Sequence, residues 1–153
     1  MSRVLSFLAV RNAICQVGRS GIGLYVEEKG TNLIYYSHAG LKKRSGFDLT
    51  FSNGQKLDWS KTYSIADPSF GISIVILKNK ELISVAPFVS VKQDIDVKEP
   101  IYCVCLNPVE SLIKVTPVES LKYLEENTDK CDHVKDGSLI FNNTWTQFFG
   151  IKT

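Results

Sequence analysis

The stretch Lys135-Asp136-Gly137-Ser138-Leu139-Ile140-Phe141-Asn142 is followed a few residues later by Phe148-Phe149-Gly150-Ile151, and these two segments decide the fold. Residues 135–138 are typical of a tight turn, and residues 139–142 form an apolar run of the strand type. A short polar segment separates this run from the second one, which we expect to return beside it. The pattern predicts one β-hairpin, in which alternation sends Phe148 and Phe149 to opposite faces of the second strand.

The length and charge of the chain set the limits for the rest of the interpretation. With 153 residues it is in the range of a single domain that can bury a core without disulfides or metals. Its apolar content of 44% and charged content of 22% are ordinary for a globular protein, and a formal net charge of +2 gives no reason to expect a nucleic acid or a membrane as partner.

The cysteines indicate the compartment and bear on metal binding. Four are present, at positions 15, 103, 105 and 131, without any Cys-x-x-Cys pair, and we interpret them as reduced thiols. The apolar part of residues 1–10 is too short for a signal-peptide core or a membrane span, so we expect a cytoplasmic or nuclear protein. Cys103 and Cys105 share one face of a strand, but a metal site needs two more soft ligands, and small buried residues are the favoured interpretation. No metal and no cofactor are expected.

The first half of the chain reads as strands joined by tight turns. Residues 4–17 begin with rough helical spacing and then alternate, which predicts a short helix or a strand. Residues 24–37 predict a hairpin. Phe47 to Phe51 predicts a strand that meets an Asn-Gly turn, and the returning arm is expected at Lys56-Leu57-Asp58-Trp59 and Tyr63-Ser64-Ile65. The dense apolar run of residues 71–77 predicts a strand buried on both faces.

The second half follows a polar connection at residues 90–100. Residues 101–108 and 111–118 predict two strands, and residues 120–126 predict either a further strand or a short helical turn. We therefore expect one domain, residues 1–153, made of a first barrel at 1–89, the connection at 90–100 and a second barrel at 101–153.

Several of these segments resemble, in the same order, motifs of trypsin-like serine peptidases of the high-temperature-requirement type. Ser20-Gly21-Ile22-Gly23-Leu24 is similar to the Gly-x-Gly strand of that family, and Tyr36-Ser37-His38-Ala39-Gly40 to the run that carries its histidine. Residues 67–77, 101–108 and 135–142 are similar to its later strands and its nucleophile turn. The resemblance implies an all-β, two-barrel trypsin-like fold of compact size, in which few residues remain to close the second barrel.

The resemblance also assigns the catalytic positions. His38 stands at the catalytic histidine, whereas Gly71 stands at the aspartate and Asp136 at the nucleophile. Serine-peptidase chemistry needs a hydroxyl nucleophile, a histidine base and a carboxylate that orients the histidine, and only one of the three is retained. A catalytically degenerate pseudoprotease is therefore expected, in which Asp136 lies near His38 and raises the pKa of that histidine.

Four alternatives remain open at this point. A shift of two residues makes Ser138 the nucleophile, with His38 as base and Asp67 as the orienting carboxylate, although the apolar residues directly after Ser138 leave no small residues for an exposed turn. Cys131 is a weaker candidate for the nucleophile, and His133, Asp136 and His38 as metal ligands are less favoured than an ordinary polar turn. The fourth alternative is a β-barrel unrelated to peptidases that binds a small ligand.

A chain without the catalytic residues is expected to act by binding. A second barrel with few closing strands leaves an open sheet edge, and such edges are usually covered. The expected partner is another protein, an extended peptide or a second copy of the chain. Phe148, Phe149 and Ile151 are the candidate binding residues, and a place in the barrel core is an equal interpretation for them.

Overall fold

The computed structural model describes residues 3–37, 47–67, 72–79, 82–91, 94–107, 112–127, 129–131 and 133–152. Its helices and strands are α1 (Arg3–Ala13), β1 (Ile14–Val17), β2 (Gly21–Glu28), β3 (Thr31–Ser37), β4 (Leu49–Phe51), the 3-10 turn η1 (Trp59–Lys61), β5 (Thr62–Asp67), β6 (Ile72–Leu77), β7 (Ile101–Asn107), β8 (Leu112–Val118), α2 (Leu121–Glu126), β9 (Leu139–Asn142) and β10 (Phe148–Ile151). Within these ranges neither helix combines the length and the apolar character that crossing a membrane requires.

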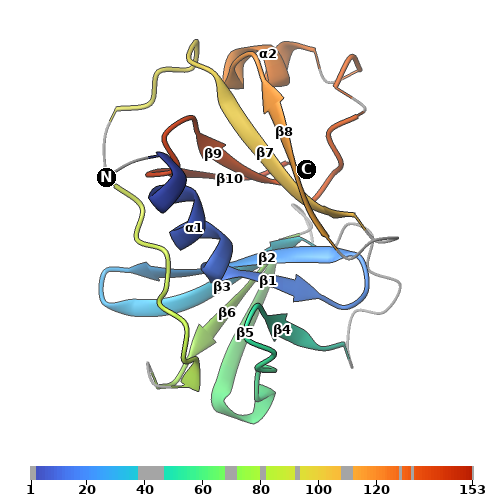
Figure 1. The fold of residues 1–153 in the computed structure, drawn as a ribbon. Helices are drawn as coiled ribbons and strands as arrows, with labels where there is room; N and C mark the ends of the chain where they lie inside the picture. The colour runs from blue at the N-terminus through green and yellow to red at the C-terminus, as the bar shows by residue number, and fades with distance from the viewer. Residues whose placement is uncertain are drawn as a thin grey trace.

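The strands form two antiparallel sheets. The first has six strands in the order β4-β1-β2-β3-β6-β5, and the second has four in the order β10-β9-β7-β8. Figure 1 shows the six-stranded sheet below and the four-stranded sheet above, with the connection between β6 and β7 along one side of both. The all-β fold class predicted from the sequence is confirmed.

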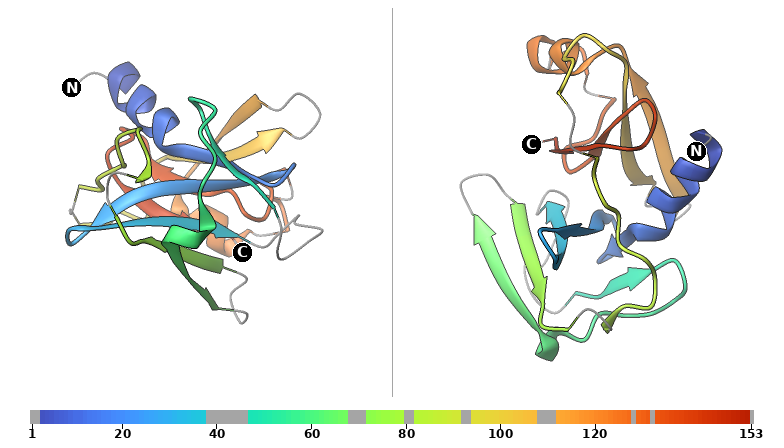
Figure 2. Two further views of the ribbon diagram at one scale, coloured as in Figure 1. Left: turned by 90° about the horizontal axis from the view of Figure 1, so that it is seen from below. Right: turned by 90° about the vertical axis from the view of Figure 1, so that its left-hand side faces the viewer.

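The helix α1 fills the side of the junction between the two sheets, as the right-hand view of Figure 2 shows. Ser6, Val10 and Ala13 are buried, and their spacing of four and three residues puts them on one face of the helix. Leu8 and Arg11 face solvent on the other side. Residues 3–17 are therefore a helix followed by a strand, so each half of the mixed sequence pattern corresponds to one element.

The strand β2 lies at the centre of the molecule, and residues 21–26 are all buried. Side chains on its two faces alternate between two cores: Leu24 belongs to the cluster between the sheets, and Tyr25 to the cluster inside the six-stranded sheet. Gly23 permits the close packing of β1 and β3, because a Cβ atom there would lie 3.0 Å from both the Cys15 Sγ and the Tyr35 carbonyl oxygen.

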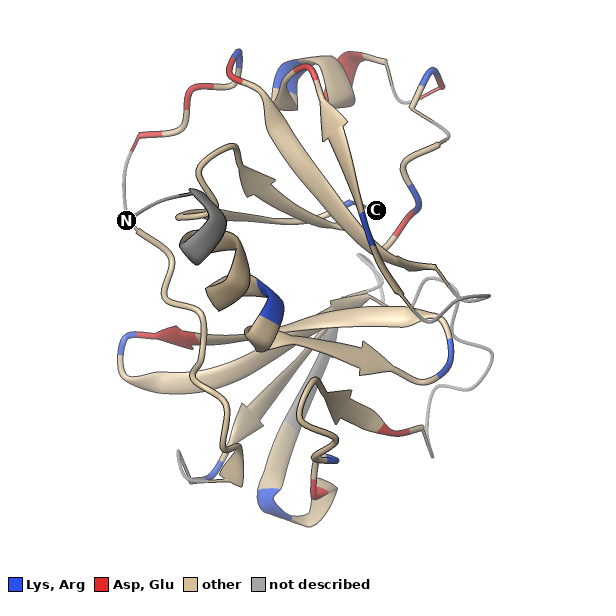
Figure 3. Ribbon diagram, in the orientation of Figure 1, with Lys and Arg blue, Asp and Glu red and all other residues tan. Residues whose placement is uncertain are grey.

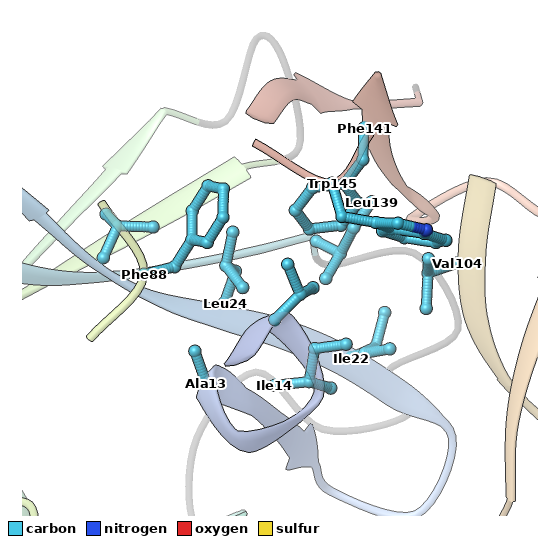
Figure 4. Close-up of a cluster of buried hydrophobic side chains, with 11 residues drawn as sticks. Ala13, Ile14, Ile22, Leu24, Phe88, Val104, Leu139, Phe141 and Trp145 are labelled. Atoms are coloured by element: carbon cyan, nitrogen blue, oxygen red, sulfur yellow. The ribbon is translucent and has the colours of Figure 1, made fainter. Parts of the chain in front are cut away.

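The inter-sheet cluster is the core that joins the two halves (Figure 4). Phe141 is fully buried at its centre, with its ring centroid 5.6 Å from that of Phe88 and 5.5 Å from that of Trp145. The ring of Trp145 also stacks on Tyr102 at 4.7 Å with 2° between the planes. The buried members of the inter-sheet cluster are Val10, Ala13, Ile14, Ile22, Leu24, Val26, Phe88, Val104, Leu139, Phe141 and Trp145.

Two predictions for the first sheet were wrong. Residues 63–65 do not return beside β4: the Asn-Gly turn closes only a short hairpin, with the bridge Thr50–Lys56, and β5 then pairs with β6. The run 72–77 is not buried on both faces, because its residues alternate between buried and half-buried. The turn η1 lies between the short hairpin of β4 and the pairing of β5 with β6, and it redirects the chain from one to the other. Asp58 caps this turn, because its carboxylate accepts a hydrogen bond from the Ser60 amide.

The predicted hairpin of β9 and β10 is present, and one buried side chain holds its turn. The Asn142 Oδ1 accepts hydrogen bonds from the Thr146 and Gln147 amides at 2.9 and 3.0 Å, and its Nδ2 donates to the Thr144 and Thr146 hydroxyl oxygens. These bonds hold Trp145 at φ +61°, a left-handed conformation that is uncommon for a large side chain. The turn thereby aims the indole ring into the inter-sheet cluster.

Candidate functional site

The candidate site is a cleft between the two sheets. It has a volume of about 280 Å³ and is lined by the start of β2, the end of β3, β7 and the turn before β9. Its lining residues are Ser20, Gly21, Ile22, Ser37, Cys105, Leu106, Lys135, Asp136 and Gly137. The turn 135–137 that the sequence singled out therefore forms one wall, and residues of the first sheet form the other.

Asp136 is engaged in an ion pair at this wall. Its Oδ1 lies 2.8 Å from the Nζ of Lys152, the residue directly after β10. The Lys152 side chain is only 13% exposed, so its ammonium is held against the protein, while the Asp136 side chain is 64% exposed and reaches solvent. Because the Asp136 side of the pair is open to solvent, the pair stabilises the fold by no more than about 1 kcal/mol. It nevertheless orients the Asp136 carboxylate toward Lys152.

Ser138 lies under the turn rather than in the cleft. It is 1% exposed, and its hydroxyl donates a hydrogen bond of 2.6 Å to the Lys135 carbonyl oxygen. Gly137, at φ +90°, makes the bend that turns the chain into β9. The Ser138 hydroxyl closes the turn from inside, which is a structural role.

Three backbone amides in the turn or directly before it already have carbonyl acceptors. The Gly137 amide donates to Lys152 O at 2.7 Å, the Ser138 amide to Lys135 O at 3.2 Å and the Val134 amide to Cys131 O at 2.9 Å. An oxyanion hole requires amides that point at the reacting oxygen and are free to bind it. These three amides are not available for that purpose.

The other predicted catalytic residues lie wholly or partly outside the described residues. His38 and Gly71 are outside the described residues, and so is the side chain of Asp67. The backbone brings their neighbours together, because Ile72 pairs with Ser37 on one side and with Asp67 on the other. Ser37, which directly precedes His38, lines the same cleft as Asp136.

The candidate binding residues lie on β10, which is an end strand of the four-stranded sheet. Phe148 and Ile151 pack against the inter-sheet cluster, whereas Phe149 packs against the cluster inside the four-stranded sheet. All three are half-buried. Phe148 and Phe149 thus contact different cores, and the register shift between Phe148 and Gly150 puts Ile151 on the same core as Phe148.

Lys152 is the site residue that sequence reasoning missed. In the structure Ile151 pairs with Leu139, so the adjoining ends of the two strands bring residues 136 and 152 together. Cys105 was considered only as a buried residue, but it is partly exposed and lines the cleft. Among the described residues no three His, Cys, Asp or Glu side chains gather in a way that would hold a metal ion.

The architecture resembles that of a solved serine endoprotease from Yersinia pestis. The two structures align with a TM-score of 0.60 over 99% of this chain and 57% of that chain, at 13% sequence identity. The chain has a trypsin-like fold. A search with protein-family models and a search of curated proteins found no match.

The trypsin-like fold confirms the two-barrel architecture that the motif order implied. Its two sheets correspond to the two barrels, and the cleft lies between them. At this level of identity the likeness extends to the fold alone, and the chain spans little more than half of the solved peptidase chain.

Proposed function

We propose that this chain is a non-catalytic protein of trypsin-like fold that binds an extended segment of another protein. The observation that carries the proposal is the state of the turn at the nucleophile position. The residue that the sequence resemblance assigns to that position is Asp136, whose carboxylate pairs with the Lys152 ammonium at 2.8 Å. An anion at this position repels the electron-rich oxygens of an acyl substrate rather than attacking its carbonyl carbon.

The alternative with Ser138 as nucleophile has less support. Its hydroxyl is buried and donates to Lys135 O, so a substrate carbonyl cannot reach it without opening of the turn. The oxyanion hole of such a site uses the amides of the nucleophile and of the residue two before it. One of the two is bonded to a carbonyl oxygen in each register: the Ser138 amide to Lys135 O, or the Val134 amide to Cys131 O.

The activity test is treatment of the folded chain with a fluorophosphonate probe and, separately, with a general protein substrate. We expect neither labelling nor cleavage under conditions in which an active serine peptidase treated alongside gives both. Triad members act as a unit, so the loss of the nucleophile removes most of the catalysis. Labelling that Ser138→Ala abolishes would contradict the proposal and restore the alternative register.

The end strand β10 supports the binding part of the proposal. The Lys152 amide and carbonyl both bond to the β9 side, to Ser138 O at 2.9 Å and to the Gly137 amide at 2.7 Å. Because backbone groups alternate in direction along a strand, those of Ile151 point to the outer edge. An extended peptide adds to such an edge through main-chain hydrogen bonds.

The binding test is selection of a random peptide library on the folded chain, followed by NMR mapping of the selected peptides. We expect the largest amide shift at Ile151, and about tenfold weaker binding for Ile151→Pro, which removes the outward N–H. Ile151→Val is the matched control: it keeps the amide and most of the apolar contact and is expected to bind as the original chain does. Shifts that gather on β8 or β5 instead, with Ile151 unchanged, would refute the assignment of the edge.

A further inference from the structure

A hollow of about 840 Å³ lies between α1 and residues 85–91 of the connection between the sheets. Figure 1 shows the helix and this part of the connection beside each other on one side of the molecule. Three of the seven large hydrophobic side chains that are exposed in the described chain line the hollow: Leu8 at 43%, Val89 at 61% and Val91 at 49%. Single exposed hydrophobic residues are normal, but their gathering around one hollow of this size is typical of a small-molecule site.

Hydrogen bonds to the rest of the molecule hold the walls of this hollow in place. The Phe88 amide donates to Tyr25 O at 2.9 Å, and the Phe88 carbonyl oxygen accepts from the Glu27 amide at 3.0 Å. The Val91 amide donates to Thr146 O at 2.8 Å. On the opposite wall, α1 is anchored by its buried face. The hollow is therefore formed in the free chain, as small-molecule sites usually are.

The polar and the apolar residues of the hollow lie at different ends. Arg11 and Asn12, in the last turn of α1, are close to Asn53 in the turn after β4. The pairing of Cys15 with Phe51 brings them together, because β1 follows α1 directly and β4 ends at that turn. These residues make one end of the hollow polar.

The other end is apolar and is built around Trp145. The ring centroid of Trp145 lies 4.9 Å from that of Phe7, which is about one helical turn before Arg11 on α1. Leu8 and Val91 line the hollow at the same end. A molecule that fills the hollow therefore meets polar groups at one end and apolar side chains at the other.

The charge of the polar end is positive. Of the described residues that line the hollow, Arg11 alone is charged, so no carboxylate among them neutralises it. In Figure 3, α1 carries one blue segment, and the part of the connection beside it is drawn in tan. Within the described part of the chain the Arg11 guanidinium has no ion pair or hydrogen bond. A guanidinium presents its N–H groups in a planar fork that matches a carboxylate.

We propose that this hollow binds a small amphipathic anion, a molecule with one carboxylate and an apolar body such as a fatty acid has. The carboxylate accepts hydrogen bonds from the Arg11 guanidinium, and the apolar body covers Leu8, Val89 and Trp145. Burial of apolar surface supplies most of the affinity, and the guanidinium fixes the orientation. The site is separate from the cleft between the sheets, because the two share no lining residue.

The test is an NMR titration of the full chain with hexanoate, octanoate and decanoate, each kept below the concentration at which it forms micelles. We expect the indole N–H signal of Trp145 to shift, whereas that of Trp59, which packs against the core inside the six-stranded sheet, stays in place. The affinity is expected to rise about fourfold for each added methylene group, because each buries further apolar surface. Decylammonium has the chain length of decanoate and the opposite charge, and we expect it to bind at least about tenfold more weakly.

Two charge variants locate the carboxylate. Arg11→Glu is expected to reverse the preference, so that decylammonium binds more tightly than decanoate. Arg19→Glu is the matched control, because Arg19 is also an exposed arginine but does not line the hollow, and we expect this variant to keep the original preference. A reversal in both variants, or in neither, would overturn the proposal.

A variant of the apolar wall tests the body of the ligand. Val89→Asp is expected to weaken decanoate binding at least about tenfold. Leu112→Asp makes a similar change at a comparably exposed residue on β8 and is expected to bind decanoate as the original chain does, and circular dichroism confirms that every variant is folded. A Trp145 signal that decanoate does not move would overturn the proposal. So would binding to phosphatidylglycerol vesicles without binding to dissolved decanoate, which would assign these exposed residues to a membrane surface. Peptide binding at Ile151 is measured separately and does not depend on any of these outcomes.

Discussion

Replacing Phe141 by alanine is expected to lower the free energy of unfolding by about 3–5 kcal/mol, a large part of the stability of an ordinary domain. The side chain is 0% exposed and lies at the centre of the inter-sheet cluster. Its ring contacts Phe88, Trp145 and Phe148 at centroid distances of 5.4–5.6 Å, so the cavity cannot close without moving several rings. Urea unfolding followed by circular dichroism measures the loss.

The matched control for this prediction is Tyr63→Ala on the end strand β5. Tyr63 is 60% exposed, and its ring lies 4.6 Å from the Lys78 ammonium, a contact worth about 0.5–1 kcal/mol at such a site. An aromatic residue is removed in both variants, but only Phe141 leaves a buried cavity. A loss for Phe141→Ala no larger than that for Tyr63→Ala would show that the cluster does not hold the two sheets together.

Stability is also expected to fall steeply in mild alkali, because the pKa values of two buried thiols are raised. Burial raises the pKa of Cys15 to about 12 and is the main cause that raises the pKa of Cys103 to about 12, against 9.0 for a free thiol. Above about pH 9 the unfolded chain therefore releases protons that the folded chain retains. Below pH 9 the thiols are neutral in both the folded and the unfolded chain, and the free energy of unfolding is not reduced. As the pH rises from 9 toward 12, each thiol lowers the free energy of unfolding by about 1.4 kcal/mol per pH unit.

Urea unfolding at several values between about pH 8 and pH 10.5, in the presence of a reductant, measures this slope. Cys15→Ala and Cys103→Ala should each make the slope shallower by about 1.4 kcal/mol per pH unit, and the double variant by about twice that. Tyrosines whose pKa is also raised by burial, Tyr25, Tyr35 and Tyr36, contribute only above their ordinary value near 10. An unchanged slope in the double variant would be incompatible with buried neutral thiols in the folded chain.

The hairpin of β9 and β10 shows what local sequence could predict. Its apolar runs and turn residues gave both strands with the bounds that the structure has, and the contact of Phe148 and Phe149 with different cores follows from alternation. The ion pair of Asp136 with Lys152 could not be predicted from the sequence, because it depends on the register of β10 against β9. The shift between Phe148 and Gly150 moves the end of β10 by one residue, and no pattern of apolar residues encodes it.

Residues 63–65, which were wrongly predicted to pair with β4, show what local sequence could not predict. Residues 63–65 alternate as a returning strand should, and the Asn-Gly turn before them favours a local hairpin. Their true partner, β6, lies later in the chain, and the pairing is set by the packing of both strands in the first sheet. Alternation identifies a strand and its buried face, but it does not identify which neighbour the strand pairs with.

The inter-sheet cluster also determines when a newly made chain can complete its core. The cluster draws on Val10 in α1 and on Trp145 in the last turn, so almost the whole sequence must be synthesised before it can assemble. At ordinary translation rates the interval between Phe88 and Trp145 takes about 3–11 seconds. During that time one face of β2, with Leu24 at its centre, has no second sheet to cover it. We therefore expect the nascent chain to expose this apolar face to chaperones until the second sheet is made, so that its yield in cells depends on their supply as well as on final stability.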